Sequence, residues 1–97
     1  MEATVYILRC ADGAYYTGLT RRPVEERVWQ HNAGVVEAYT KSRRPVELVY
    51  AESYERIIDA IERERQIKGW TRRKKEALIR GDFDALQDLA SWLKEAR

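Results

Sequence analysis

The stretch Thr4–Leu19, TVYILRCADGAYYTGL, contains two runs of residues that favour β-strands, separated by Ala11-Asp12-Gly13. This pattern predicts a β-hairpin with strands over Thr4–Arg9 and Tyr15–Leu19. Two strands that are joined by so short a loop pair with each other in antiparallel fashion. The hairpin therefore decides the start of the fold, and the rest of the chain has to pack around it.

The length of the hairpin loop decides which side chains share a face of the sheet. Gly13 in the third loop position favours a three-residue loop, a type I turn that ends with a left-handed residue, over a two-residue turn. Cys10 then faces Ala14, and even-numbered residues of both strands lie on one face. The sequence therefore predicts that Tyr6 and Tyr16 point the same way.

The remaining chain predicts one more strand and several helices, in the overall order ββαβααα. They are a helix from Pro23 to about Asn32 that stops at Gly34, a strand over Val46–Tyr50, a helix from Glu55 to about Trp70, a short helix over Arg72–Arg80 that ends at Gly81, and a C-terminal helix over about 82–96. Proline and glycine at these limits suit helix starts and stops. The fold class is α+β.

The composition indicates a soluble globular chain. It has 97 residues, 44% of them hydrophobic and 35% charged, which suits one domain over residues 1–97. No apolar run approaches the roughly 18 residues of a membrane span, and Met1–Thr4 lacks the pattern of a signal peptide. The single Cys10 cannot form an internal disulfide, so we expect a reducing cytoplasm and no membrane partner.

Positive charge is concentrated in one segment of the chain. The net charge is only +2, but Arg63–Arg80 contains eight basic and two acidic residues, while the segments on either side are each net negative. Basic residues beside Trp70 suit contact with nucleic-acid phosphates and bases. A solvated helix face is the ordinary alternative for such a charge run, so this feature needs support from others.

Three polar side chains fall on the apolar faces of predicted helices. Glu64 lies in the middle of the apolar stripe of its helix, and Arg27 and His31 lie on the inward face of the first helix. A carboxylate that faces a core needs a cation or a hydrogen-bonding partner. Glu64 therefore either binds a metal or forms a salt bridge, for example with Lys68 one turn later. An ion pair between Arg27 and Glu64 is the third interpretation.

Together with Tyr6 and Tyr16, these groups suit phosphodiester hydrolysis. That reaction needs an activated water, a cation at the scissile phosphate and charge relief for the leaving oxygen. The sequence has no Cys/His zinc pattern and no glycine-rich phosphate loop, and its only histidine is His31. These absences argue against a zinc hydrolase, an NTPase and a Ser/His/Asp hydrolase.

The ordered set of motifs resembles the GIY-YIG nuclease superfamily. Val5-Tyr6-Ile7 and Tyr16-Thr17-Gly18 look like its two paired motifs, Glu26–Asn32 like its helix, Ala60–Trp70 like its metal-binding segment, and Arg43–Tyr50 like the small stand-alone bacterial branch. The similarity covers about residues 4–80. Thr4 stands where the first motif has glycine, and Thr17 where the second has an apolar residue. Both tyrosines are retained.

The resemblance implies a three-stranded antiparallel sheet flanked by helices and a metal-dependent endonuclease. The products would be a 5′-phosphate and a 3′-hydroxyl. Glu64 would hold one divalent metal, usually magnesium, with manganese as the alternative. Tyr6 and Tyr16 would flank the attacking water, Arg27 would stabilise the transition state, and His31 would assist water activation or orient a tyrosine. We favour Tyr6 as the base and keep Tyr16 as the alternative. Gly18 would be structural.

The expected substrate is DNA, and RNA stays open. Larger relatives attach a separate recognition domain, whereas here only Leu78–Arg97 remains, so we expect single-stranded, branched or distorted DNA. The candidates for contact with the nucleic acid are Lys41, Arg43, Arg44, Lys68, Trp70, Arg72, Arg73, Lys74 and Lys75. The alternative hypothesis is a nucleic-acid-binding module of the same fold with little catalysis of its own.

Overall fold

The computed structural model describes residues 2–36 and 38–86. In chain order the elements are β1 (Ala3–Arg9), β2 (Tyr15–Thr20), α1 (Val24–Ala33), α2 (Ala38–Lys41), β3 (Glu47–Tyr54), α3 (Ile57–Lys68) and α4 (Arg72–Arg80). The strands form a three-stranded antiparallel sheet in the order β2-β1-β3. This arrangement confirms the α+β fold with an antiparallel sheet flanked by helices.

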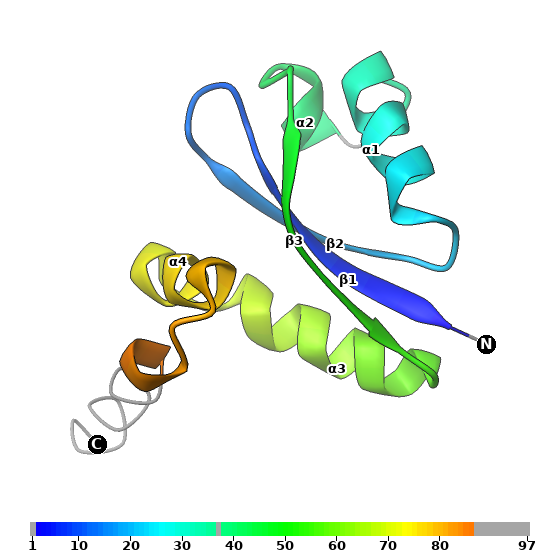
Figure 1. Cartoon of the computed structure of the whole chain (residues 1–97). Coiled ribbons are helices and arrows are strands. Elements are labelled where there is room, and N and C mark those ends of the chain that lie inside the picture. The colour runs from blue at the N-terminus through cyan, green and yellow to red at the C-terminus, as the bar shows by residue number, and fades with distance from the viewer. Residues whose placement is uncertain (1, 37, 87–97) are drawn as a thin grey trace.

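Helices cover both faces of the sheet (Figure 1), with α1 and α2 on one side and α3 and α4 on the other. On the α3–α4 side, Val5 and Ile7 pack with buried residues of the two helices, Ala60, Ile67 and Leu78. On the α1 side, Leu8 and Val46 pack with the partly buried Val24 and Val28. Alternation along β1 thus supplies both cores, and its even-numbered residues face α1.

The hairpin has the predicted three-residue loop. The Cys10 amide donates to the Ala14 carbonyl at 2.8 Å, and Gly13 has a φ of 86°. That left-handed conformation disfavours side chains, so glycine is the residue the turn requires. The register places Tyr6 opposite Gly18 and Leu8 opposite Tyr16. Tyr6 and Tyr16 therefore share the face that packs against α1, as predicted.

Three element limits differ by two residues or more from the sequence-based prediction. The third strand runs from Glu47 to Tyr54 and not only to Tyr50, because its second half pairs with the first residues of β1. Pairing in the sheet overrides the weak strand preference of Ala51 and Ser53. The helix predicted over Glu55–Trp70 is α3, which begins and ends two residues inside the predicted limits. Helix ends read from sequence commonly shift by this much.

The predicted polar loop after Gly34 contains a short helix, α2 (Ala38–Lys41), which the sequence pattern missed. Four residues are too few for helical periodicity to be visible. The predicted C-terminal helix is seen only at its start, with residues 83–86 helical, and the rest lies outside the described residues. No helix in the described part of the chain has the length and apolar character needed to cross a membrane.

Candidate active site

Tyr6 is the centre of a buried polar cluster on the α1 face of the sheet. Its side chain is fully buried. Its phenol oxygen lies 2.9 Å from Nε2 of His31 and 3.4 Å from Nε of Arg27. β1 therefore presents the phenol group to two residues that lie one turn apart on α1, because residues four apart share one helix face. The inward orientation predicted for His31 is confirmed.

His31 is held from both sides of its ring. Nδ1 lies 2.8 Å from the hydroxyl of Thr40 on α2, while Nε2 contacts Tyr6. His31 and Thr40 are both 0% exposed. Sequence reasoning missed Thr40, because the segment was read as a loop and a threonine gives no signal of its own. A hydroxyl on Nδ1 fixes the orientation and influences the tautomer of the imidazole.

Tyr16 adds a second phenol beside the histidine. Its ring centroid lies 5.1 Å from that of His31 and 6.3 Å from that of Tyr6. On another side it stacks on Tyr39 of α2, 6.0 Å away, and Tyr39 is 41% exposed. The ring cluster therefore runs from the buried Tyr6 to the protein surface. Distances of this size are typical of favourable aromatic packing.

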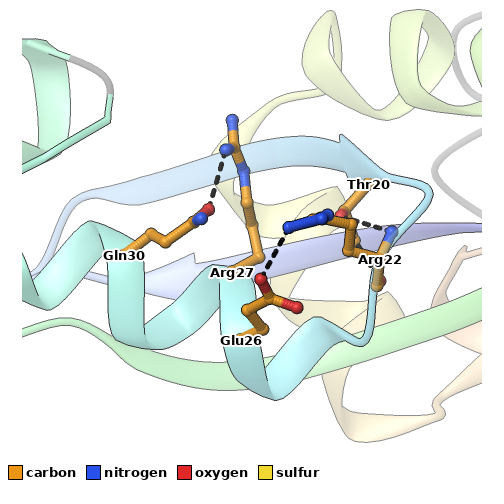
Figure 2. A network of polar contacts seen from close by, with 5 residues as sticks. All are labelled: Thr20, Arg22, Glu26, Arg27 and Gln30. Atoms are coloured by element: carbon orange, nitrogen blue, oxygen red, sulfur yellow. Dashed lines mark hydrogen bonds and ion pairs between the residues drawn. The ribbon is translucent and has the colours of Figure 1, made fainter.

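Arg27 is oriented by its own helix. Its Nη1 donates to the side-chain oxygen of Gln30 at 3.0 Å, while Nε faces the phenol oxygen of Tyr6. Figure 2 shows the arginine extended from α1 and Gln30 bonded to its guanidinium. The ion pair of Arg22 with Glu26, at 2.9 Å, lies beside it at the start of the same helix. A guanidinium held in this way is suited to a phosphate oxygen.

Gly18 allows Tyr6 and Tyr16 to approach the strand. A Cβ at this position would lie 2.5 Å from Cζ and the hydroxyl oxygen of Tyr6 and 2.9 Å from Cε1 of Tyr16. Carbon contacts are favourable only near 3.5–4.0 Å. The glycine of the second motif is therefore required by the tyrosine on the neighbouring strand.

We expect Gly18→Ala to lower cleavage by about tenfold or more, because the new methyl group displaces both tyrosines and small misplacements at an active site are costly. Nuclease assays and thermal unfolding would measure the effect. Gly13→Ala is the matched control, since Gly13 has strained backbone but nothing within 4 Å of its Cβ position. It should reduce stability and leave cleavage close to that of the parent. Equal activity of both variants would contradict this role of Gly18.

Glu64 lies on α3, on the opposite side of the sheet from α1. Its side chain is 15% exposed, and its carboxylate pairs with Lys68 at 3.2 Å, which is the salt bridge considered from the sequence. β2 is an edge strand, and at this edge Lys68 lines a pocket together with Tyr16 and Thr17. Lys68 therefore contacts both Glu64 and the pocket beside Tyr16, while the contacts around the Tyr6 phenol come from Arg27 and His31.

The carboxylate of Glu64 fits one kind of metal site. No group of three or more His, Cys, Asp or Glu side chains is arranged to hold an ion within residues 2–36 and 38–86. Magnesium keeps several waters and is commonly held by one or two carboxylates with substrate phosphates. Glu64 is a single, largely buried carboxylate that, among the described residues, pairs with one exposed lysine, and it meets that requirement.

Several of the predicted nucleic-acid contacts already bond within the protein. Arg43 pairs with Asp12 at 2.9 Å, Arg44 donates to the Lys41 carbonyl at 2.8 Å, and Arg72 donates to the Gly13 carbonyl at 2.7 Å. Trp70 is half-buried, and its ring contacts the charged groups of Arg63 and Lys74. Lys41 and Arg73 are exposed, and Lys68 and Lys75 line the pocket beside Tyr16.

One face of the hairpin carries two tyrosines, and an arginine and a histidine of the next helix lie beside them. The chain belongs to the GIY-YIG nuclease family, because the sequence model described as "GIY-YIG catalytic domain" matches residues 2–77. It is also similar to UPF0213 proteins of Staphylococcus aureus, for example those of strains N315 and COL. These are 51% identical over 76 residues, which cover 78% of this chain and 92% of each relative.

Two solved structures support the same family. The UPF0213 protein BH0048 from Bacillus halodurans is 39% identical, with a TM-score of 0.54 over 81% of this chain and 83% of that one. The protein EF2693 from E. faecalis is 33% identical, with a TM-score of 0.59 over 86% of this chain and 88% of that one. Their names state no activity.

Proposed function

We propose that this protein is a divalent-metal-dependent endonuclease that hydrolyses DNA to 5′-phosphate and 3′-hydroxyl ends, on single-stranded, branched or distorted DNA. The observation that carries the proposal is the phenol oxygen of Tyr6, which contacts both His31 and Arg27 at a site next to Tyr16. This set contains a proton acceptor, a fixed positive charge and a phenol that can act on water.

Tyr6 is the proposed base. Arg27 Nε can only donate, so of the two contacts it is Nε2 of His31 that can accept the Tyr6 proton. We therefore assign the tautomer with the proton on Nδ1, donated to the hydroxyl of Thr40. A nearby guanidinium stabilises a phenolate. The phenolate then takes a proton from the water that attacks the phosphorus atom.

Arg27 and Glu64 are proposed to stabilise the negative charge that develops on the phosphate and on the leaving oxygen. The guanidinium of Arg27 has donors to spare after its contacts with Tyr6 and Gln30, and these suit the phosphate oxygens of the transition state. Glu64 would hold the divalent ion, magnesium in our proposal with manganese as the alternative. When bound, such an ion polarises the phosphate and relieves the charge of the leaving oxygen.

Unpaired DNA is the proposed substrate because an aromatic ring is exposed beside the site. Tyr39, which stacks on Tyr16, is 41% exposed. Exposed rings provide stacking surfaces for bases that are outside a duplex, whatever the sequence. Exposed cations such as Lys41 and Arg73 suit the phosphate backbone.

The test is a nuclease assay on single-stranded, duplex and branched DNA and on RNA, with and without magnesium or manganese. We expect metal-dependent cuts in single-stranded or branched DNA, with ends that a ligase accepts because they carry 5′-phosphate and 3′-hydroxyl groups. Binding without cleavage under every condition would overturn the nuclease proposal. That result would favour the alternative, a nucleic-acid-binding module of the same fold.

Thr40 is proposed as a positioning residue for His31. Thr40→Val keeps the shape of the side chain but removes the hydroxyl from Nδ1, so the tautomer that accepts from Tyr6 is no longer favoured. We expect cleavage to fall by about tenfold. This is a smaller loss than the 10²–10⁴-fold expected when a general base is removed. Thr40→Ser should restore most of the activity. If the serine and valine variants cleave equally slowly, the role of the hydroxyl is wrong.

A further inference from the structure

The four consecutive basic residues at the start of α4 separate in space. Lys74 lies over the ring of Trp70, with its ammonium 4.3 Å from the ring centroid. Arg72 lies over Tyr15 at 4.5 Å and bonds to the hairpin loop. Lys75 is half-buried and lines the pocket beside Tyr16. Of Arg72, Lys74 and Lys75, only Lys75 therefore faces the proposed active site.

Two lysines line the pocket beside Tyr16 and Tyr39. Its volume is about 310 Å³, and it is lined by Tyr15, Tyr16, Thr17, Tyr39, Lys68 and Lys75. Within the described ranges Lys75 has no acidic partner, and Lys68 pairs with Glu64 alone. Burial, followed by the charge of Lys68, lowers the pKa of the Lys75 ammonium. The two cations repel each other, and an anion between them would relieve that repulsion.

Thr17 gives the pocket a third polar group. It is 3% exposed, and its hydroxyl has no hydrogen-bond partner among the described residues. A buried hydroxyl without a partner costs about 1–3 kcal/mol. The family motif has an apolar residue at this position, so the hydroxyl is a feature of this chain that packing alone does not require.

We propose that Lys68, Lys75 and Thr17 form a subsite for a phosphate group beside Tyr16. Two ammonium groups and a hydroxyl can each donate a hydrogen bond to phosphate oxygens. The inference rests on the proposed function for its ligand, which is a backbone phosphate of the DNA strand next to the one that is cut. Its position beside Tyr16, across from the Arg27 side of the ring cluster, would fix the direction of the strand through the site.

The test measures binding without cleavage, in metal-free buffer at low salt. Inorganic phosphate is titrated into the protein while amide chemical shifts are followed, and the largest changes are expected at Thr17, Lys68 and Lys75. Lys75→Gln should weaken phosphate binding by about tenfold, the effect of one charge-assisted hydrogen bond. Arg65→Gln removes the same charge from an exposed position of α3 and should change the affinity by less than about twofold.

Two further experiments identify the ligand and show whether a loss of binding is caused by misfolding. Thr17→Val, which removes a buried unpaired hydroxyl without changing shape, should fold at least as well as the parent and bind phosphate more weakly. A single-stranded oligonucleotide should displace phosphate from the pocket. Equal affinities of Lys75→Gln and Arg65→Gln, or no displacement by the oligonucleotide, would overturn the subsite. A protein that binds phosphate here but never cuts DNA would refute only the nuclease function.

Discussion

Replacing Tyr6 with phenylalanine is expected to slow DNA cleavage by about 10²–10⁴-fold, the usual contribution of a positioned general base. The ring stays in the core, but the atom that contacts His31 and Arg27 is lost. His31 and Arg27 each lose a hydrogen-bonding partner in a buried site. We therefore also expect a loss of about 1–3 kcal/mol in the free energy of unfolding. Single-turnover cleavage and chemical denaturation would measure the two effects separately.

Tyr50→Phe is the control for the loss of a phenol group from the same sheet. The Tyr50 hydroxyl bonds to Glu52 on β3, and burial with this contact raises the pKa of Tyr50 to about 12. This variant should lose some stability and retain normal cleavage, since Glu52 keeps its bonds to Tyr54 and Arg63. A greater loss of cleavage in Tyr16→Phe than in Tyr6→Phe would make Tyr16 the base and refute our assignment.

The features that the sequence predicted correctly are local ones. The length of the Ala11–Gly13 loop sets the register of the hairpin, and the register places Tyr6 and Tyr16 on one face. Helical spacing likewise places Arg27 and His31 on the inward face of α1. Each of these inferences needs only a few neighbouring residues and a fixed period, so no knowledge of the tertiary structure was required.

The features that the sequence did not predict depend on contacts across the fold. Thr40 lies in a four-residue helix that shows no periodicity, and its role follows only from its distance to His31. The second half of β3 pairs with the beginning of β1 despite weak local preference. Lys75 lines the tyrosine pocket whereas the neighbouring Lys74 lies over Trp70, and this difference follows only from the packing of α4 in the fold.

For Glu64, the helical pattern predicted the need for a partner but not which partner it has. Its place in the apolar stripe predicted a carboxylate in need of a partner, and the structure provides Lys68. The lysine side chain is 62% exposed, so the pair contributes no more than about 1 kcal/mol to stability. The pair with Arg27 that the sequence also allowed is not formed, since Arg27 bonds to Tyr6 and Gln30. The contribution of this pair to stability therefore does not explain why a carboxylate lies at this position.

Glu64→Gln is expected to reduce cleavage by about 10³-fold or more, because the several kcal/mol that a bound metal contributes to the transition state would be lost. DNA binding in metal-free buffer should survive, since Lys68, Lys75 and Arg27 are retained. The unfolding free energy should change by less than about 1 kcal/mol, because glutamine has a similar size and its amide oxygen can still accept from Lys68. Cleavage assays and denaturation at 25 °C would measure these effects.

Glu62→Gln is the matched control, since it makes the same change on an exposed position of the same helix. It should cleave DNA like the parent. Metal binding can also be measured without activity, because an ion that binds only the folded protein raises its melting temperature. Magnesium should raise the melting temperature of the parent and of Glu62→Gln, but not that of Glu64→Gln. If Glu64→Gln cuts at the parent rate, or gains the same stability from magnesium, the carboxylate does not hold the metal and its salt bridge with Lys68 is its only role.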